Sequence, residues 1–333
     1  IKMINQKLLE KENLMLGADI VLDDVDLYIK KWQENKRRLS EKEFLSSLSE
    51  ICDLYDIRKV ELLKFLIENG LFYKERTING EVIIFTYERY EKICFAKRLL
   101  SSLELANAEE ELKKSINSGK LMEYVFYDYN NTVFDEGILE ELVNIIQLKY
   151  RLDFYSLIEQ DKVNDDIKKI YIKNLIWYKE QYNSDIVINN IKKINKNNEF
   201  TNEIIDFFIK ASYLLNNPFN IIYLNQHLLK YNMAELDYNW SIPVIFYYFN
   251  YSREGIDKIT EYCLIYGNGY MDNNSKYLVA LLFSWLLSSS DRYLRDRSTK
   301  ALTKVLLNSH DVSIKLLENF ENEEDMYILE RIV

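Results

Sequence analysis

Proline and glycine are scarce in this chain. Of its 333 residues, only 2 are proline and 8 are glycine, and these are the residues that most often break helices or form tight turns. Long, uninterrupted helices are therefore the expected default. Apolar side chains make up 48% of the residues and charged ones 29%, which is the balance of a globular protein with a sizeable core.

A seven-residue pattern occurs twice near the end of the sequence. Asp291-Arg-Tyr-Leu-Arg-Asp-Arg297 and Asp325-Met-Tyr-Ile-Leu-Glu-Arg331 share Asp, Tyr, an aliphatic residue, an acid and Arg, and they start 34 positions apart. A fixed period of this length is typical of stacked helical repeats, in which each unit buries its apolar face against the next. We therefore predict a structural role for the charged residues of both copies, namely Asp291, Arg295, Asp296, Arg297, Asp325 and Arg331.

The ends of the sequence suggest that it belongs to a longer protein. It begins with Ile1 rather than Met, and it stops at Val333, two residues after the second copy of the repeat. A helical repeat cut inside its first helix cannot bury its apolar face. We expect an internal piece, truncated within a repeat array.

Residues 39–107 have a pattern of their own. The expected elements are, in order, a helix begun by the capping-box spacing Ser40-Glu-Lys-Glu43, a helix over 58–69 that ends at Gly70, strands over 71–78 and 81–85 around Asn79-Gly80, and a helix from Tyr87. Asn-Gly is a strong hairpin signal because both turn positions need positive φ, and glycine is the usual residue just after a helix end. Helix, helix, hairpin and helix in this order predict a winged-helix domain with one β-hairpin.

The remaining sequence is expected to be helical. Residues 1–38 predict a helical connector of two short helices around Gly17. From 108 to 333 the apolar periodicity predicts an α-helical repeat region, truncated at its C-terminus, with helices near 107–117, 136–148, 166–182, 200–215, 220–231, 241–250, 254–265, 274–287 and 291–308. The last of these fits a HEAT-type inner helix, because small and aliphatic residues share one face. The fold class is thus mainly α, a winged-helix domain followed by a HEAT-like solenoid.

Charge argues against a general nucleic-acid binder. The chain carries a formal net charge of −10, whereas phosphate contacts need a basic surface. The second helix of the expected winged helix, which reads DNA in many such domains, sets Arg58, Lys59 and Lys64 against Glu61 and Glu68. A packing or regulatory role is therefore favoured over DNA reading.

No residue pattern indicates catalysis or a bound cofactor. None of the glycines opens a GxxxxGK[ST] phosphate loop, and neither His227 nor His310 has a partner at metal-ligand spacing. The acidic clusters are explained by helix starts, where carboxylates favour the dipole. We expect no catalytic, cofactor-binding or metal-binding residue in this chain.

A cytoplasmic location is the expectation. The three cysteines are widely spaced and form no CxxC motif, which suits a reducing compartment. The longest apolar runs, such as 277–287, are far shorter than the ~20 residues that a membrane-spanning helix needs. No membrane association is predicted.

Several motifs occur together in an order that resembles a known family. Ile84-Phe-Thr-Tyr-Glu-Arg-Tyr90 is similar to the winged-helix segment of large bacterial STAND-class P-loop ATPases, including the AVAST-type antiphage proteins. Gly137-Ile-Leu-Glu-Glu141 looks like the start of a later helix in those proteins, and Asn217-Pro-Phe-Asn220 followed by Asp237-Tyr-Asn-Trp-Ser241 looks like a further stretch of their sequence. Ser290 to Leu302 resembles their HEAT-like helix. The motif residues with an implied structural role are Phe85, Tyr87, Glu88, Arg89, Asn220, Asp237, Trp240, Asp291, Arg295, Asp296, Arg297, Asp325 and Arg331.

The resemblance covers about residues 40–333 and implies a parent protein with three parts. These are an N-terminal effector, a central ATPase that binds ATP and Mg, and a C-terminal helical sensor. Such proteins rest as monomers, bind a foreign protein through the sensor, and form homo-oligomers with ATP to activate the effector. The family pattern has an Asp-His pair where this chain has Lys92-Ile93, so no nucleotide-sensing role is carried over to that helix.

Two functional hypotheses follow from the sequence. The first is a non-catalytic regulatory and sensor module of a STAND-class ATPase, which relays recognition of a phage protein by helical repeats to oligomerisation. The alternative is a DNA-binding winged-helix regulator with a helical-repeat partner-binding domain. Walker A and B motifs upstream of Ile1 would support the first, and salt-dependent DNA binding by residues 40–107 would support the second.

Overall fold

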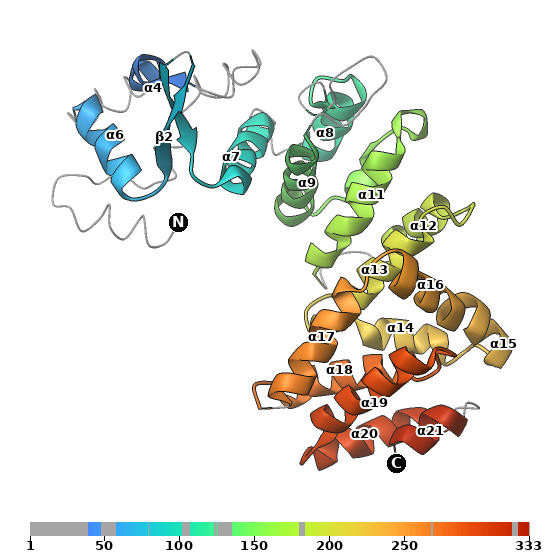
Figure 1. Cartoon of the computed structure of the whole chain (residues 1–333). Helices are drawn as coiled ribbons and strands as arrows, with labels where there is room; N and C mark the ends of the chain where they lie inside the picture. Colours follow the sequence, from blue (N-terminus) through green and yellow to red (C-terminus); the bar gives the residue numbers. More distant parts are fainter. Residues whose placement is uncertain are drawn as a thin grey trace. The chain divides into compact units, whose positions relative to one another are not determined.

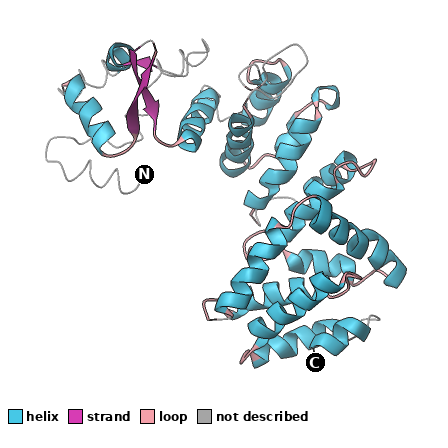
Figure 2. Cartoon of the chain, in the orientation of Figure 1, coloured by secondary structure: helices cyan, strands magenta, loops and turns pink. Residues whose placement is uncertain are grey.

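The computed structural model shows a mainly helical protein with one small antiparallel sheet (Figures 1 and 2). It describes residues 39–47, 58–78, 80–101, 107–122, 125, 135–179, 184–267, 269–321 and 326–332. The connector expected over 1–38 lies outside these residues, as do Asn79 and Asp325. The chain forms two compact units, 1–145 and 146–333.

The sheet lies in the first unit and has the strand order β1-β3-β2. The strands are β1 (Leu39–Ser40), β2 (Phe72–Thr77) and β3 (Gly80–Phe85). The expected hairpin is present, because β2 pairs with β3 from Phe72 opposite Phe85 to Thr77 opposite Gly80. The rings of Phe72 and Phe85 lie 4.3 Å apart, and Phe44 contacts Phe72 edge-on at 4.9 Å. These aromatic rings join the β2–β3 hairpin to the helix over Glu41–Ser47, which follows β1.

The helices of the first unit begin and end where local signals predict. They are α4 (Glu41–Ser47), α6 (Lys59–Glu68), α7 (Glu88–Ser101), α8 (Ala108–Asn117) and α9 (Glu136–Ile145). At the start of α4, Ser40 N donates to Glu43 Oε2 over 3.0 Å and Glu43 N donates to Ser40 Oγ over 3.4 Å. This reciprocal pair is the expected capping box. Gly70, with φ of 72°, ends α6 in a Schellman motif, in which Leu71 N donates to Leu66 O.

The second unit consists of helices, including short 3₁₀ and π segments. In chain order they are η3 (Ile146–Tyr150), α10 (Phe154–Leu157), η4 (Gln160–Lys162), α11 (Asp165–Asn174), η5 (Leu175–Trp177), α12 (Ser184–Ile194), α13 (Thr201–Ala211), α14 (Ile221–Leu228), α15 (Met233–Leu236), η6 (Asp237–Ser241), α16 (Ile242–Asn250), α17 (Glu254–Tyr266), α18 (Asn273–Leu286), α19 (Arg292–Leu306), α20 (His310–Phe320) and α21 (Met326–Ile332). The sequence predictions omit α10, α12, α15 and α20.

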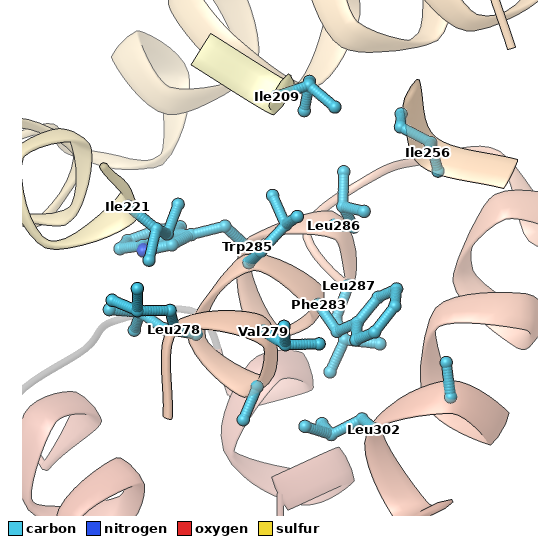
Figure 3. Packing of buried hydrophobic residues seen from close by; sticks show 14 of the residues in the cluster. Ile209, Ile221, Ile256, Leu278, Val279, Phe283, Trp285, Leu286, Leu287 and Leu302 are labelled. Carbon is cyan, nitrogen blue, oxygen red and sulfur yellow. The ribbon is translucent and has the colours of Figure 1, made fainter. Parts of the chain in front are cut away.

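Helix α18 is the centre of the second unit's larger core. Every residue from Tyr277 to Leu286 is buried, as expected of a helix that is apolar all round. Figure 3 shows its side chains surrounded by residues of four other helices, namely Ile209 of α13, Ile221 of α14, Ile256 of α17 and Leu302 of α19. A second cluster, which includes Tyr155, Tyr171 and Phe207, lies under α10 to α13.

Helices α17 and α19 pack against each other and run in the same direction. Near their starts, Arg297 Nη2 lies 3.3 Å from Asp257 Oδ1. Near their ends, the carbonyl oxygen of Lys304 lies 3.7 Å from the position that a Cβ atom on Gly267 would take. Helix α18 lies between them in the sequence, so the two parallel helices are next but one to each other along the chain. The face of α19 that packs inward contains Leu294, Ser298, Ala301, Leu302 and Val305, which agrees with the face expected from the sequence.

Within the described ranges, no helix combines the length and the apolar character that crossing a bilayer requires.

Candidate functional site

Two of the motif segments meet in the first unit, at the junction of α7 and α9. Arg89, in the first turn of α7, places its Nε 3.0 Å from Oε1 of Glu141 on α9. The two side chains differ in environment, because that of Arg89 is 66% exposed whereas that of Glu141 is 8% exposed. An almost buried carboxylate is costly without a cation, so this ion pair ties the start of α7 to the middle of α9.

A second ionic contact joins the same two helices. Lys92 Nζ lies 2.9 Å from Glu88 Oε1 and 3.3 Å from the buried carboxylate of Asp135. Burial lowers the pKa of Lys92, but the hydrogen bond to Glu88 and the charge of Asp135 outweigh it, so the pKa is raised. Asp135 also accepts hydrogen bonds from the backbone N–H groups of Gly137 and Ile138 at the start of α9. Lys92 thus binds the residue that caps α9.

Gly137 makes room for this lysine. A Cβ atom at position 137 would lie 2.4 Å from Lys92 Cδ and 2.7 Å from its Nζ. The lysine stem therefore crosses directly over the glycine backbone. Of the two neighbouring motif residues, Phe85 is buried at the end of β3, whereas Tyr87 is exposed before α7.

In the second unit, the motif residue Trp240 takes part in a buried polar network. Its Nε1 donates to the carbonyl oxygen of Trp285 over 3.0 Å. Trp285 in turn donates from its own Nε1 to Asn225 Oδ1 over 2.8 Å. Asn225 and Asn319 exchange hydrogen bonds through their side-chain amides, at 2.8 and 3.1 Å. The network fixes η6, α14, α18 and α20 relative to one another.

The turn between α18 and α19 is held by the first copy of the repeat. Asp291 caps α19 by accepting from Leu294 N over 2.8 Å. Arg295 Nη1 donates to the carbonyl oxygens of Ser289 and Ser290, at 2.9 and 3.0 Å. Arg297 contacts Asp257 of α17 as described above. Asp291, Arg295 and Arg297 therefore each have a structural partner within the second unit.

The other predicted residues are placed as follows. Asp296 lies 3.6 Å from Arg292 on the surface of α19. Asn220 caps α14, accepting from Ile222 N over 3.0 Å. Asp237 is exposed at the start of η6, and Arg331 is exposed on α21. Because Asp325 lies outside the described residues, the match between the two repeat copies stays a prediction.

A carboxylate that the sequence does not single out organises the early helices of the second unit. Asp153 Oδ1 accepts hydrogen bonds from the hydroxyl groups of Tyr171 and Tyr178, at 2.7 and 2.8 Å. Its Oδ2 accepts from Asn190 Nδ2 over 2.8 Å and from Ser156 N over 2.9 Å. Burial, followed by the Asp153 charge, raises the pKa of both tyrosines. In the sequence near Asp153, only the Asp-x-x-Ser spacing indicates part of this network. The other donors come from α11, α12 and the segment after η5.

Groups that could support chemistry have ordinary structural surroundings. Burial raises the pKa of the Cys263 thiol to about 12, so it is not a thiolate nucleophile at neutral pH. His227 Nδ1 lies 3.0 Å from Tyr223 O, and His310 is the first residue of α20. In the part of the chain that the structure describes, no group of three or more His, Cys, Asp or Glu side chains is arranged to hold a metal ion.

Comparisons with protein-family models, with curated proteins and with solved structures find no match for this chain.

Proposed function

We propose that this chain is the regulatory and sensor module of a STAND-class ATPase of the antiphage type. In this proposal, residues 39–107 form a winged-helix domain and residues 108–333 form a HEAT-like array that binds a foreign protein. The module has no catalysis of its own. ATP and Mg act in a separate ATPase domain, and target binding leads to homo-oligomerisation of the whole protein.

The α7–α9 junction is the observation that carries this proposal. It brings together two of the segments that resemble the family, around Arg89–Glu141 and Lys92–Asp135. Helix α7 follows directly after β3. A displacement of α9 would therefore act on α7 through the two ion pairs, and through α7 on the β2–β3 hairpin. A nearly buried carboxylate that loses its cation is left as an uncompensated charge, which is strongly destabilising. A junction of this kind suits a relay with two packings that differ by a few kcal/mol.

The helix arrangement of the second unit supports the sensor part of the proposal. Helices α17 and α19 run in the same direction with α18 between them, as expected for equivalent helices of successive repeats. The charged residues of the first repeat copy hold the α18–α19 turn and the α17–α19 contact. These contacts are compatible with a ladder of charged residues along successive repeats, which is the role we propose for them.

Two of the three cations at helix α6, the helix that would read DNA in the alternative hypothesis, form ion pairs. Arg58 contacts Glu61, and Lys64 Nζ lies 3.7 Å from Glu68 Oε1. Exposed pairs such as these lower the positive potential that phosphate binding needs. The charge on this helix therefore favours the regulatory role.

The coding sequence upstream of Ile1 gives the first test. Walker A and Walker B motifs within a few hundred residues are expected. A reading frame that starts near residue 1 without them would contradict the proposal. Salt-dependent binding of duplex DNA by residues 1–333, measured by fluorescence anisotropy, would instead support the DNA-binding regulator.

The relay is tested in the full-length protein by mass photometry with ATP and a panel of candidate phage proteins. We expect oligomers only when a recognised phage protein is present. Arg89→Glu places like charges together and should change the amount of oligomer formed, whereas the exchanged pair Arg89→Glu/Glu141→Arg should restore the wild-type response. If the single and the exchanged variants behave alike, the junction is not the relay.

A further inference from the structure

The buried face of helix α20 does not coincide with the whole of its apolar face. Val312, Leu316 and Phe320, each four positions after the last, are buried in the larger core of the second unit. Leu317 packs partly buried against the same core. Ile314, which lies on the Leu317 side of the helix at a spacing of three, is 56% exposed. At 3.6 residues per turn these apolar side chains span about 200° of the helix circumference, and only part of that span is buried.

Apolar burial alone does not explain this orientation of α20. A rotation of the helix by about 60° around its own axis would bury Ile314 and expose Val312, while the other three apolar residues stay on the inner side. Isoleucine has one more methylene group than valine, so the exchange would bury slightly more apolar surface. Another contact must therefore favour the position in which Val312 is buried.

A buried amide pair lies on the Val312 side of the helix. Asn319 comes seven residues after Val312 and three after Leu316, a spacing that places the three on one side. Its side-chain amide exchanges hydrogen bonds with that of Asn225 on α14, at 2.8 and 3.1 Å. Asn225 is buried, and its Oδ1 also accepts from Trp285 Nε1 of α18 over 2.8 Å. This side of α20 is therefore held by directional polar contacts.

A second polar contact lies on the same side. Lys315, four residues before Asn319, places its Nζ 3.9 Å from the centre of the Tyr277 ring on α18, a position in which a cation is attracted to the ring. The rotation that buries Ile314 would carry Lys315 and Asn319 away from both partners. The buried amide N–H of Asn225 would then lose its acceptor, and a buried donor without a partner is destabilising.

We propose that the Asn225–Asn319 amide pair is a latch that holds α20 in one of two rotational positions. With the pair formed, Val312 is buried and Ile314 is exposed. With the pair broken, α20 rotates by about 60° and the two residues exchange places. Buried polar side chains select one arrangement among packings of similar apolar burial in the same way. A small rotation of a packed helix is also one of the movements by which proteins switch. The latch goes beyond the proposed function, because it does not depend on what the chain recognises.

The first test is the urea midpoint of residues 1–333. In the wild type, Ile314→Ser should change the midpoint little, because the side chain is mostly exposed. In the Asn319→Ala background the same substitution should lower the midpoint, because Ile314 is then buried in the rotated position. The two residues lie five positions apart and on different sides of the helix, so a direct contact between them does not account for such coupling.

The matched control is Glu318→Ala, which changes an exposed residue of the same helix next to Asn319. Ile314→Ser should have the same small effect in that background as in the wild type.

Methyl NMR with a soluble paramagnetic probe gives a second measurement. The Ile314 methyl signal should be broadened about twofold less in Asn319→Ala if the two positions are equally populated. Ile186 on α12, which is 43% exposed, is the internal reference and should not change.

The proposal is overturned if Ile314→Ser has the same effect on the midpoint in the wild type and in the Asn319→Ala background. It is also overturned if the Ile314 methyl group stays as exposed in Asn319→Ala as in the wild type, because a loss of stability alone would not protect it. No phage protein, nucleotide or ATPase domain takes part in these measurements. Their outcome is therefore independent of the tests of the proposed function.

Discussion

Tyrosine hydroxyl groups that donate to carboxylates recur in the core of the second unit. Tyr247 donates to Asp206 over 2.6 Å and Tyr248 donates to Asp257 over 2.8 Å, in addition to the two tyrosines on Asp153. In each case the ring is buried while the hydroxyl group reaches a charged acceptor. Hydrogen bonds to charged groups are stronger than neutral ones. The tyrosine-rich composition thus supplies polar contacts as well as apolar area.

Asp153 is expected to be the most sensitive of these carboxylates to substitution. Asp153→Ala removes a hydrogen-bond acceptor that four residues share. The buried hydroxyl groups of Tyr171 and Tyr178 then lose the acceptor to which they donate. We expect the free energy of unfolding to fall by about 3 kcal/mol, measured by urea denaturation. Asp161→Ala, at an exposed position in η4, is the control and should change it by less than about 0.5 kcal/mol. Equal effects would show that the network contributes little.

The same tyrosines predict how stability depends on pH. Burial raises the pKa of Tyr171 and Tyr178 above the ordinary value of 10.0. Above that pH the unfolded chain releases these protons while the folded chain keeps them, so stability is fully present below pH 10 and falls as pH rises further. Each proton contributes about 1.4 kcal/mol per pH unit. Denaturation at several pH values should show a shallower loss for Tyr178→Phe than for the wild type, and parallel curves would contradict the assignment.

At the scale of elements, the contact between α7 and α9 depends on the Lys92 side chain, which passes close over the backbone of Gly137 to reach Asp135. Gly137 has ordinary helical geometry, so its role is to leave space rather than to adopt positive φ. Alanine would favour the helix by up to about 1 kcal/mol if nothing else changed. The position of the Lys92 side chain reverses this expectation.

Gly137→Ala should destabilise the wild type but not a variant that lacks the lysine. The added methyl group pushes the Lys92 side chain away from Asp135, at an expected cost of about 1–2 kcal/mol, as for loss of a partly buried ion pair. In the Lys92→Ala background the same substitution should be neutral or stabilising. Thermal denaturation of the four proteins measures the coupling. If the effects of Gly137→Ala and Lys92→Ala on stability are additive, the Lys92 side chain moves aside without losing stabilising contacts.

For the whole molecule, the division into units at 145 and 146 predicts two cooperative transitions. Calorimetry of residues 1–333 should resolve both, since separate compact units need not unfold together. Asp153→Ala should lower the midpoint of one transition, and Gly137→Ala should lower that of the other. A single transition lowered by both variants would show that the units unfold as one. The domain boundary expected at 107 and 108 stays a prediction.

Local signals in the sequence were sufficient for several elements. The capping box at Ser40, the Schellman end at Gly70 and the β2–β3 hairpin depend on residues only a few positions apart, and all three are present. Helix α12 was missed because its Asn and Asp residues resemble a turn, although Val187, Ile191 and Ile194 are buried. Packing against the neighbouring aromatic cluster outweighed its weak helix propensity.

The candidate sites could be predicted only in part. The sequence singled out Arg89 and Arg297 as members of motifs, but their partners Glu141 and Asp257 lie 52 and 40 positions away. The Asp153 network joins residues up to 37 positions apart. Its members have no shared pattern from which their proximity could be inferred.

The sequence by itself determined that this protein is mainly helical, where several of its helices begin, and that a hairpin interrupts them. These properties follow from backbone geometry, apolar periodicity and capping, which act over a few residues. Tertiary structure alone decided which carboxylate each arginine and tyrosine contacts and that α17 and α19 run in the same direction. Those outcomes depend on how helices distant in sequence bury their apolar faces against one another.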